Sequence, residues 1–309
     1  MTTGRLPDTY LIGAPKAGTT SLADWLAQHD QVYFSVPKEP FYWAADYPGM
    51  RARYGFDTAE AYAALFAGPE AYAATRIAEG STTYLYSERA VPDIVAAGGE
   101  PRFIVSLRRP ADLLVSYHRT QLVALNEDEP DFERAWRRSL RGEGPGVTPV
   151  DPNIVDYPRI GRLGSALERL YAVVPRHRVH VVLFDELAAD PGAVWRSLTG
   201  FLDLRSDPAP DFAVRNASTK AARSASLRRF MHTPPPVLAG PIRTLRHWSR
   251  TTSNPLVGKF KSALWRDAAH PSVTAEVKAE VSEYFAADTA LAAELTGLDL
   301  SAWIRLPSR

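Results

Sequence analysis

The sequence contains no cysteine, which excludes disulfide bonds and metal sites built on thiolates. It also contains no apolar run of about 18 residues or more, so no segment is predicted to span a membrane. The segment from Met1 to Pro7 lacks the apolar stretch of a signal peptide. We therefore expect a soluble intracellular protein that resides in the cytoplasm.

The sequence also lacks an excess of positive charge. It contains 36 basic and 35 acidic residues, so its formal net charge is +1. Proteins that coat nucleic acid usually carry a basic excess, so we expect no nucleic-acid partner and only a local anion site. The 309 residues, 45% of them hydrophobic, are enough for a large core. We predict one domain over residues 1–309, and the abundance of alanine and arginine is typical of a bacterial source.

Short apolar segments alternate with segments of helical periodicity. The predicted buried strands are Thr9–Gly13, Arg76–Glu79, Arg102–Leu107 and Arg178–Phe184. The predicted helices are Ser21–Gln28, Ala111–Ala124, Arg159–Val174, Pro191–Leu202 and a tail pattern from Val273 to Leu295 within residues 273–309. This alternation predicts an α/β fold with a P-loop-like parallel sheet that is flanked by helices on both faces.

Two regions lack such periodicity. Residues 142–158 are rich in glycine and proline and are predicted to form a surface loop near the substrate side. Residues 206–261 contain three consecutive prolines and many arginines. That segment fits either a solvated surface or a lid that supplies cations to a bound anion.

The segment from Tyr10 to Leu22 predicts a strand, a tight loop and a helix N-terminus. Such a junction points backbone N–H groups and the positive end of a helix dipole at one place, which suits a phosphate. Lys16 adds a full charge, and the candidate loop residues are Ala17, Gly18, Thr19, Thr20 and Ser21. The loop is not a Walker A motif, because Lys16 precedes Gly18 by two residues. An ordinary turn with a surface lysine is the alternative.

A second signal of the same kind follows the strand Arg102–Leu107. The strand runs into Arg108 and Arg109, a helix opens at Pro110, and Ser116 lies inside that helix. Arginine at the carboxyl end of a parallel strand faces the crevice where α/β proteins bind ligands, and guanidinium binds phosphate well. Two such loops favour a ligand that carries phosphates at separate positions.

Two further segments contain candidate catalytic residues. Glu79 stands where a strand ends, so it is a candidate general base, with a helix cap or a salt bridge as the alternative. Lys38 precedes Glu39 and a cluster of aromatic residues, and either approaches a leaving group or belongs to a loop that only packs. The scattered histidines form no convincing metal-binding cluster, so no metal is expected.

Taken in order, these segments resemble the PAPS-dependent sulfotransferases, in particular the bacterial and heparan-sulfate-type branch. PAPS is 3′-phosphoadenosine-5′-phosphosulfate. The matching stretches cover nearly the whole chain and are PKAGTTSL, PKEPFYW, EGSTTYLYS, the segment from Leu107 to Tyr117, RVHVVLFDELAADPGAVWRSLTGFLDL, NASTKAARSASLRR and ELTGLDLSAW. Departures are Arg109, where the family often has Asp or Asn, and Leu113, where it often has arginine.

The resemblance implies a sulfotransferase fold, PAPS as co-substrate and PAP as product. It implies that Lys16 and the N–H groups of residues 17–20 bind the 5′-phosphate, and that Arg108 and Ser116 bind the 3′-phosphate. Glu79 would be the catalytic carboxylate, Lys38 a second cation near the sulfuryl group, and Arg223 part of a segment that closes over the nucleotide.

The acceptor implied is a small molecule, glycan or lipid-like compound with a hydroxyl group. Phe41, Tyr42, Trp43, Tyr84 and Tyr86 either line its cleft or belong to the core. The alternatives to a sulfotransferase are a P-loop-type nucleotide kinase, a non-catalytic nucleotide-binding protein and a protein that binds acidic glycans without modifying them.

Overall fold

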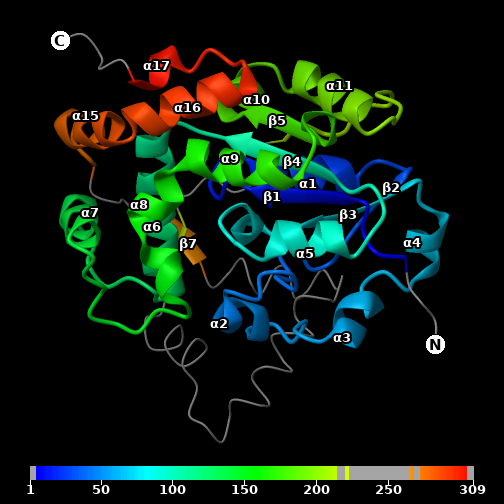
Figure 1. Cartoon of the computed structure of the whole chain (residues 1–309), viewed down its shortest axis with the longest axis horizontal. Helices are drawn as coiled ribbons and strands as arrows, with labels where there is room; N and C mark the ends of the chain where they lie inside the picture. Colours follow the sequence, from blue (N-terminus) through cyan, green and yellow to red (C-terminus); the bar gives the residue numbers. More distant parts are fainter. Residues whose placement is uncertain (1–4, 214–219, 223–264, 268–271, 305–309) are drawn as a thin grey trace, which may run out of the picture.

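The computed structural model describes residues 5–213, 220–222, 265–267 and 272–304. Its centre is a five-stranded sheet in the order β2-β3-β1-β4-β5, in which every neighbouring pair is parallel (Figure 1). The strands are β1 (Thr9–Gly13), β2 (Val32–Phe34), β3 (Arg76–Gly80), β4 (Arg102–Leu107) and β5 (Val179–Leu183). The predicted α/β class with a parallel sheet is confirmed.

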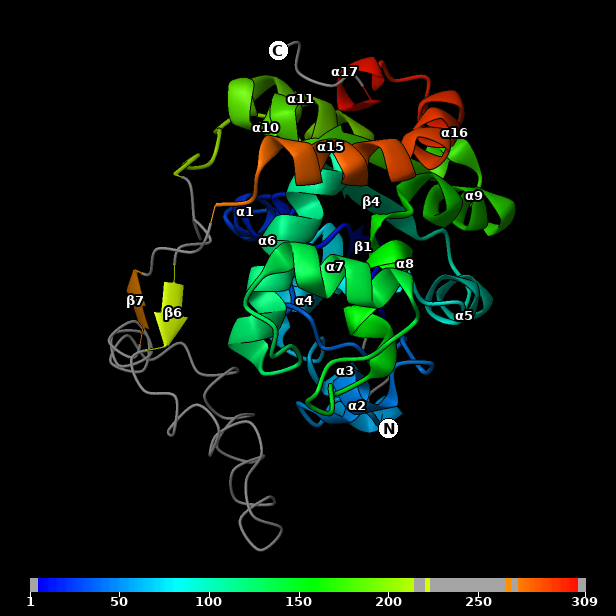
Figure 2. The ribbon, with the colours of Figure 1, turned by 90° about the vertical axis from the view of Figure 1, so that its left-hand side faces the viewer.

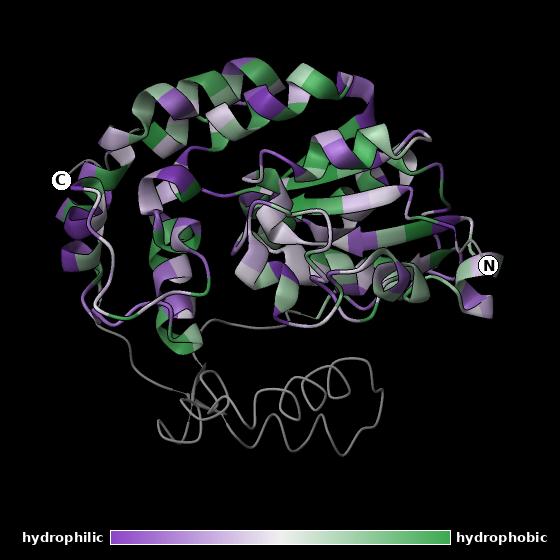
Figure 3. Cartoon of the chain, turned by 60° about the horizontal axis from the view of Figure 1, so that its bottom comes forward, coloured by the Kyte–Doolittle hydropathy of each residue, from purple (hydrophilic) through white to green (hydrophobic). Residues whose placement is uncertain are grey.

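Helices cover both faces of this sheet, because side chains along each strand alternate between the two faces. Tyr10 and Ile12 of β1 belong to the larger core cluster, with α5 (Ala90–Ala96), α6 (Pro110–Ala124) and α9 (Leu163–Val173). Leu11 belongs to a second cluster, with α1 (Thr19–Ala27) and α11 (Pro191–Phe201). Figure 3 shows hydrophobic strands lying among helices of mixed hydropathy.

Most predicted elements have the expected bounds within a residue or two. β1 and β4 agree with the prediction, β3 extends to Gly80, and α1 begins at Thr19 rather than Ser21. β5 ends at Leu183, because Phe184 already opens α10 (Phe184–Ala189). The sequence pattern could not separate that strand from the helix, since apolar residues run across the junction.

The predicted helix Arg159–Val174 is instead two helices, α8 (Tyr157–Gly161) and α9, separated at Arg162. The carboxylate of Asp288, from the tail, accepts hydrogen bonds from the backbone of Gly164 and Ser165 and from the Ser165 hydroxyl. It thereby caps a new helix N-terminus that the local sequence does not indicate. The tail pattern is likewise interrupted, between α15 (Ala275–Tyr284) and α16 (Ala286–Thr296).

The remaining elements of the described ranges are short. They are α2 (Pro48–Ala52), α3 (Ala59–Ala64), α4 (Pro69–Ala73), α7 (Phe132–Leu140), α17 (Ser301–Ile304), three 3₁₀ helices (Thr82–Leu85, Pro152–Val155 and Arg176–Arg178) and an antiparallel pair of strands, β6 (Lys220–Ala222) with β7 (Trp265–Asp267). Figure 2 views the molecule from the side of α6, α7 and α8, with α15 lying across above them.

Within the described ranges, no helix combines the length and the apolar character that a membrane crossing requires. Residues 142–158, predicted as a surface loop, contain the 3₁₀ helix Pro152–Val155 and the start of α8. Of the predicted lid-like segment 206–261, only residues 206–213 and 220–222 belong to the described part.

Candidate functional site

The segments that follow β1, β3 and β4 meet at the carboxyl edge of the sheet. The backbone N–H of Ala14 donates to the carbonyl oxygen of Ser106 at 2.7 Å, and the Ser106 hydroxyl donates to the Ala17 carbonyl. The segment after β2 joins them, because the Glu39 N–H donates to the Gly80 carbonyl oxygen at 2.7 Å. Together with the pairing of β1 with β3 and with β4, these bonds hold the four predicted binding or catalytic segments next to one another.

The loop from Ala14 to Gly18 leads directly into the N-terminus of α1. Gly18 caps the helix with a left-handed backbone, φ 84°, and makes no side-chain capping bond. The first N–H groups of a helix have no partner within the helix and carry the positive end of its dipole. A Cβ atom at Gly18 would lie 3.2 Å from Phe184 and 3.3 Å from Leu187, so both space and conformation require glycine here.

Lys16 lies half-buried in this loop, at a positive φ of 66°. Burial lowers the pKa of its ammonium group, and the nearby Arg108 and Lys38 lower that pKa further, whereas Glu39 raises it. Several cations gathered against one loop destabilise one another unless an anion joins them. The electrostatics around Lys16 therefore fit an anionic ligand.

Arg108 contacts the same loop from the end of β4. Its Nη1 donates to the carbonyl oxygen of Lys16 at 2.9 Å, and its guanidinium lies 4.3 Å from the ring centroid of Phe184. Burial lowers the pKa of Arg108, whereas the nearby carboxylates of Asp112 and Asp185 raise it. The neighbouring Arg109 turns to the C-terminal region instead and donates to the carbonyl oxygen of Ala302 at 2.7 Å.

The other predicted binding residues differ in exposure. Ala17, Thr19 and Ser21 are buried, whereas Thr20 is exposed at the start of α1. Ser116 is buried in the second turn of α6, the helix that begins directly after Arg108 and Arg109. Arg223 lies outside the described residues.

Lys38 and Glu39 form an ion pair of 2.9 Å beside the end of β3, with both side chains partly exposed. The Lys38 side chain lies close to Gly80. A Cβ atom added to Gly80 would be 3.5 Å from the Cε atom of Lys38. The Glu39 carboxylate accepts a hydrogen bond from the Thr82 hydroxyl at 3.4 Å. Glu39 was not among the expected catalytic residues, although its place beside Lys38 was a signal that could have identified it.

Glu79 is fully buried. Its carboxylate accepts hydrogen bonds from the hydroxyls of Ser81 at 2.6 Å, Tyr62 at 2.9 Å and Tyr84 at 3.2 Å. Burial raises its pKa to about 7, although those three hydrogen bonds lower it and Glu39 raises it. The group can exchange a proton near neutral pH, but neighbouring side chains enclose it.

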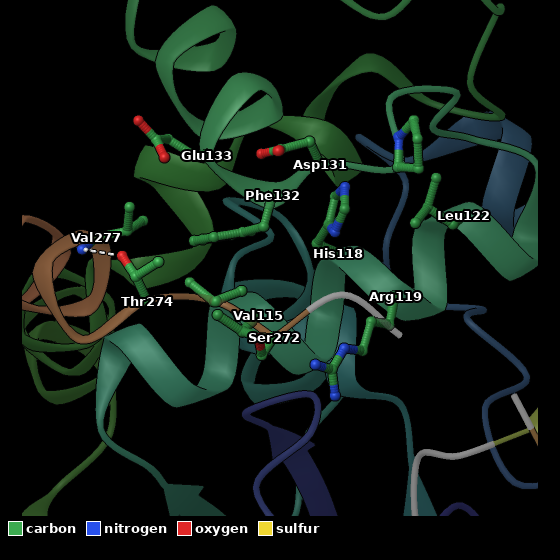
Figure 4. Close-up of a pocket in the computed structure, with 12 residues that line it drawn as sticks. Val115, His118, Arg119, Leu122, Asp131, Phe132, Glu133, Ser272, Thr274 and Val277 are labelled. Atoms are coloured by element: carbon green, nitrogen blue, oxygen red, sulfur yellow. Dashed lines mark hydrogen bonds between the residues drawn. The ribbon is translucent and has the colours of Figure 1, made fainter. Parts of the chain in front are cut away.

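Two cavities lie away from this edge. One, of about 100 Å³, lies between α6, the start of α7 and the segment that enters α15 (Figure 4). Its His118 is buried, has a lowered pKa because of that burial, and bonds the Glu129 carbonyl oxygen at 2.8 Å. The other, of about 220 Å³, lies between the 3₁₀ helix Thr82–Leu85, α5 and α9. Among the residues predicted to bind a ligand or to act in catalysis, Tyr84 lines the second cavity and none lines the first.

In the part of the chain that the structure describes, no group of three or more His, Asp or Glu side chains is placed to hold a metal ion. The groups that gather at the carboxyl edge are cations, a helix N-terminus and two carboxylates. This set suits a phosphorylated organic ligand and a proton transfer beside it.

No family model matches the chain. Carbohydrate sulfotransferase 15 from Homo sapiens is 55% identical to it over 38 residues, which are 12% of this chain and 7% of the human protein. The Rattus norvegicus protein of the same name gives the same values. The chain thus matches only a small fraction of these relatives' length.

A likeness over the full length comes from a solved structure. The crystal structure of a sulfotransferase from Alicyclobacillus acidocaldarius superimposes with a TM-score of 0.67 and 22% sequence identity. The superposition covers 97% of this chain and 100% of that chain. The five-stranded parallel sheet, with its helices on both faces, therefore has the sulfotransferase fold.

Proposed function

We propose that the protein is a PAPS-dependent sulfotransferase, which transfers a sulfuryl group to a hydroxyl and releases a sulfate ester and PAP. The observation that carries this proposal is the pairing of Lys16 and Arg108 at the N-terminus of α1, with Arg108 bonded to the Lys16 carbonyl oxygen at 2.9 Å. The fold and the short segment shared with carbohydrate sulfotransferase 15 support it.

The two sides of this cationic centre suit the two phosphates of the donor. In the proposal, Lys16 and the N–H groups of residues 17–20 bind the 5′-phosphate, and the hydroxyls of Thr19, Thr20 and Ser21 border that site. Arg108 and Ser116 bind the 3′-phosphate, since a guanidinium and a hydroxyl are good phosphate donors. A role for Arg223 in closing the site stays a prediction from the sequence.

In the proposed reaction the acceptor oxygen attacks sulfur, its proton passes to a general base, and the 5′-phosphate leaves with the bonding electron pair. Positioning and charge stabilisation do most of the catalysis in transfers of this kind. Lys16 and Lys38 neutralise the leaving group. We assign the base to Glu39 rather than to Glu79, because Glu39 is partly exposed beside Lys38 whereas Glu79 is enclosed.

The acceptor side of the site is proposed to begin at Tyr42 and Trp43. Both residues are half-buried in the segment that follows Glu39, whereas Phe41, Tyr84 and Tyr86 belong to the core. Tyr42 stacks on Tyr62 at 4.3 Å and carries the Arg51 guanidinium 5.1 Å from its ring centroid. Aromatic side chains at these positions suit contact with a sugar, a phenol or a lipid-like alcohol.

The direct test is incubation with labelled PAPS and a panel of glycans, phenols and alcohols, followed by mass spectrometry for the mass of one added SO₃. The proposal is supported if the protein transfers a sulfuryl group to any acceptor and a Lys16→Ala variant transfers none. Tight binding of PAP without transfer would point to a nucleotide-binding protein. Stabilisation by ATP with magnesium but not by PAP would instead favour a nucleotide kinase.

A further inference from the structure

The hydrogen bonds around Glu79 continue beyond its carboxylate to the segment Phe41–Trp43. The Ser81 hydroxyl accepts the backbone N–H of Phe41 at 3.1 Å, and the Tyr84 hydroxyl accepts that of Trp43 at 3.1 Å. The Tyr62 hydroxyl accepts the indole N–H of Trp43 at 3.0 Å. Each of the three hydroxyls that bond Glu79 therefore also bonds this one segment.

The direction of these bonds follows from the chemistry of the carboxylate. Above its pKa of about 7, Glu79 is ionised and only accepts. Each hydroxyl then donates its single proton to the carboxylate and accepts a hydrogen bond from the segment through a lone pair. A backbone or indole N–H can only donate, so the arrangement is consistent at all three positions. Connected hydrogen bonds of this kind strengthen one another in a buried environment.

The segment that is held in this way needs external support. Glu39 and Phe41 have left-handed backbones, with φ of 67° and 61°, which residues other than glycine rarely adopt. Such conformations persist only where surrounding contacts fix them. The contacts that fix them include the Glu39 N–H bond to Gly80 and the three bonds to the hydroxyls.

We propose that Glu79 is a positioning residue, which acts through the hydroxyls of Tyr62, Ser81 and Tyr84 to fix the segment that carries Lys38 and Glu39. This inference rests on the proposed function for its effect on turnover, but not for its effect on the segment. Glutamine at position 79 would supply one acceptor oxygen and an amide donor, so it could not accept from all three hydroxyls.

The test combines amide hydrogen exchange with kinetics in the Glu79→Gln variant at about pH 8, where Glu79 of the unaltered protein is ionised. We expect faster exchange of the peptide that covers residues 39–44, with unchanged exchange in the Lys16 loop. We also expect kcat to fall about 10- to 100-fold, with PAP affinity within a few-fold of the original, because Lys16 and Arg108 lie on other loops. Tyr84→Phe keeps the carboxylate but removes one link, and should give a smaller change in the same direction.

Glu127→Gln is the matched control. Glu127 is also fully buried, but it bonds Arg138, Tyr157 and the backbone of residues 128 and 129 rather than the segment 41–43. Its substitution should leave exchange at residues 39–44 unaltered. If Glu79→Gln does not fold, Tyr84→Phe and Ser81→Ala carry the same test.

Unchanged exchange of residues 39–44 in the Glu79 variant would overturn the inference, and if turnover were lost at the same time Glu79 would belong to the chemistry itself. Combining Glu79→Gln with Tyr84→Phe should cost less than the two separate losses together, since both act through one network. If the unaltered protein transfers sulfuryl groups to no acceptor, the proposed function fails, while the exchange data still decide the role of Glu79.

Discussion

The guanidinium of Arg108 and the main-chain oxygen of Lys16 are joined by a 2.9 Å hydrogen bond, although 92 positions separate them in the chain. The end of β4 thus shapes the loop that follows β1. In the proposed complex Arg108 has two tasks, since it binds the 3′-phosphate and also holds the loop for the 5′-phosphate. In that complex, a change at the 3′-phosphate side would alter the loop that binds the 5′-phosphate.

Replacing Arg108 by alanine should weaken the binding of PAP more than the binding of AMP, which lacks the 3′-phosphate. Charged hydrogen bonds contribute about 1.5–3 kcal/mol, so we expect roughly a 10- to 100-fold loss for PAP. The affinity for AMP should fall less, because only the altered Lys16 loop affects it. Isothermal titration calorimetry with both nucleotides measures the difference, and equal losses would rule out contact between Arg108 and the 3′-phosphate.

Replacing Glu39 by glutamine should lower turnover about 10²- to 10⁴-fold, the usual effect of removing a general base. PAP binding should persist, because Lys16 and Arg108 are unaltered. Single-turnover kinetics with saturating PAPS separates the chemical step from donor binding. Turnover close to that of the unaltered protein would exclude Glu39 as the base.

Glu79 should make stability fall as the pH rises. Its pKa in the folded protein is about 7, against an ordinary value of 4.5. Between these values the folded state holds a proton that the unfolded state has lost, so the folded state is favoured at the acidic end of this window. The stabilisation relative to a Glu79→Gln variant should decline by about 3 kcal/mol between pH 4.5 and pH 8.

Urea unfolding of both proteins across this pH range measures that difference, and other titrating groups largely cancel because both proteins contain them. A difference in unfolding free energy that stays constant, or that grows with pH, would contradict the raised pKa.

Gly18→Ala should destabilise the protein and weaken PAP binding together. The left-handed backbone opposes any Cβ, and the new methyl group would press against Phe184 and Leu187. We expect a loss of about 1–2 kcal/mol in the free energy of unfolding. Gly200 in α11 is the matched control, because a Cβ there meets nothing within 4 Å. Gly200→Ala should be neutral or slightly stabilising, and an equal loss in both variants would refute the argument.

The sequence predicts well those features that depend on neighbouring residues. The strand, loop and helix around Lys16 depend on an apolar run, a glycine and a helical period, all of which are local. The meeting of Lys16 with Arg108 follows from the rule that parallel strands present their carboxyl ends at one edge. The fold class and the placement of both loops could therefore be predicted.

Features created by distant chain segments could not be predicted. The enclosure of Glu79 depends on Tyr62, which reaches it from α3, so the sequence around Glu79 does not indicate that its carboxylate is buried. The break between α8 and α9 depends on Asp288 in the tail. β2 has only three residues, too few for a reliable periodic signal. The single domain and the cytoplasmic location remain predictions.

The central position of β1, between β3 and β4, has a thermodynamic consequence. A molecule that touched the loops after all three strands could be retained only while the middle of the sheet was intact. Its binding free energy would then add to the free energy of unfolding, so that the melting temperature would rise with its concentration. Thermal titration would thus rank candidate donors by their affinity for the folded protein.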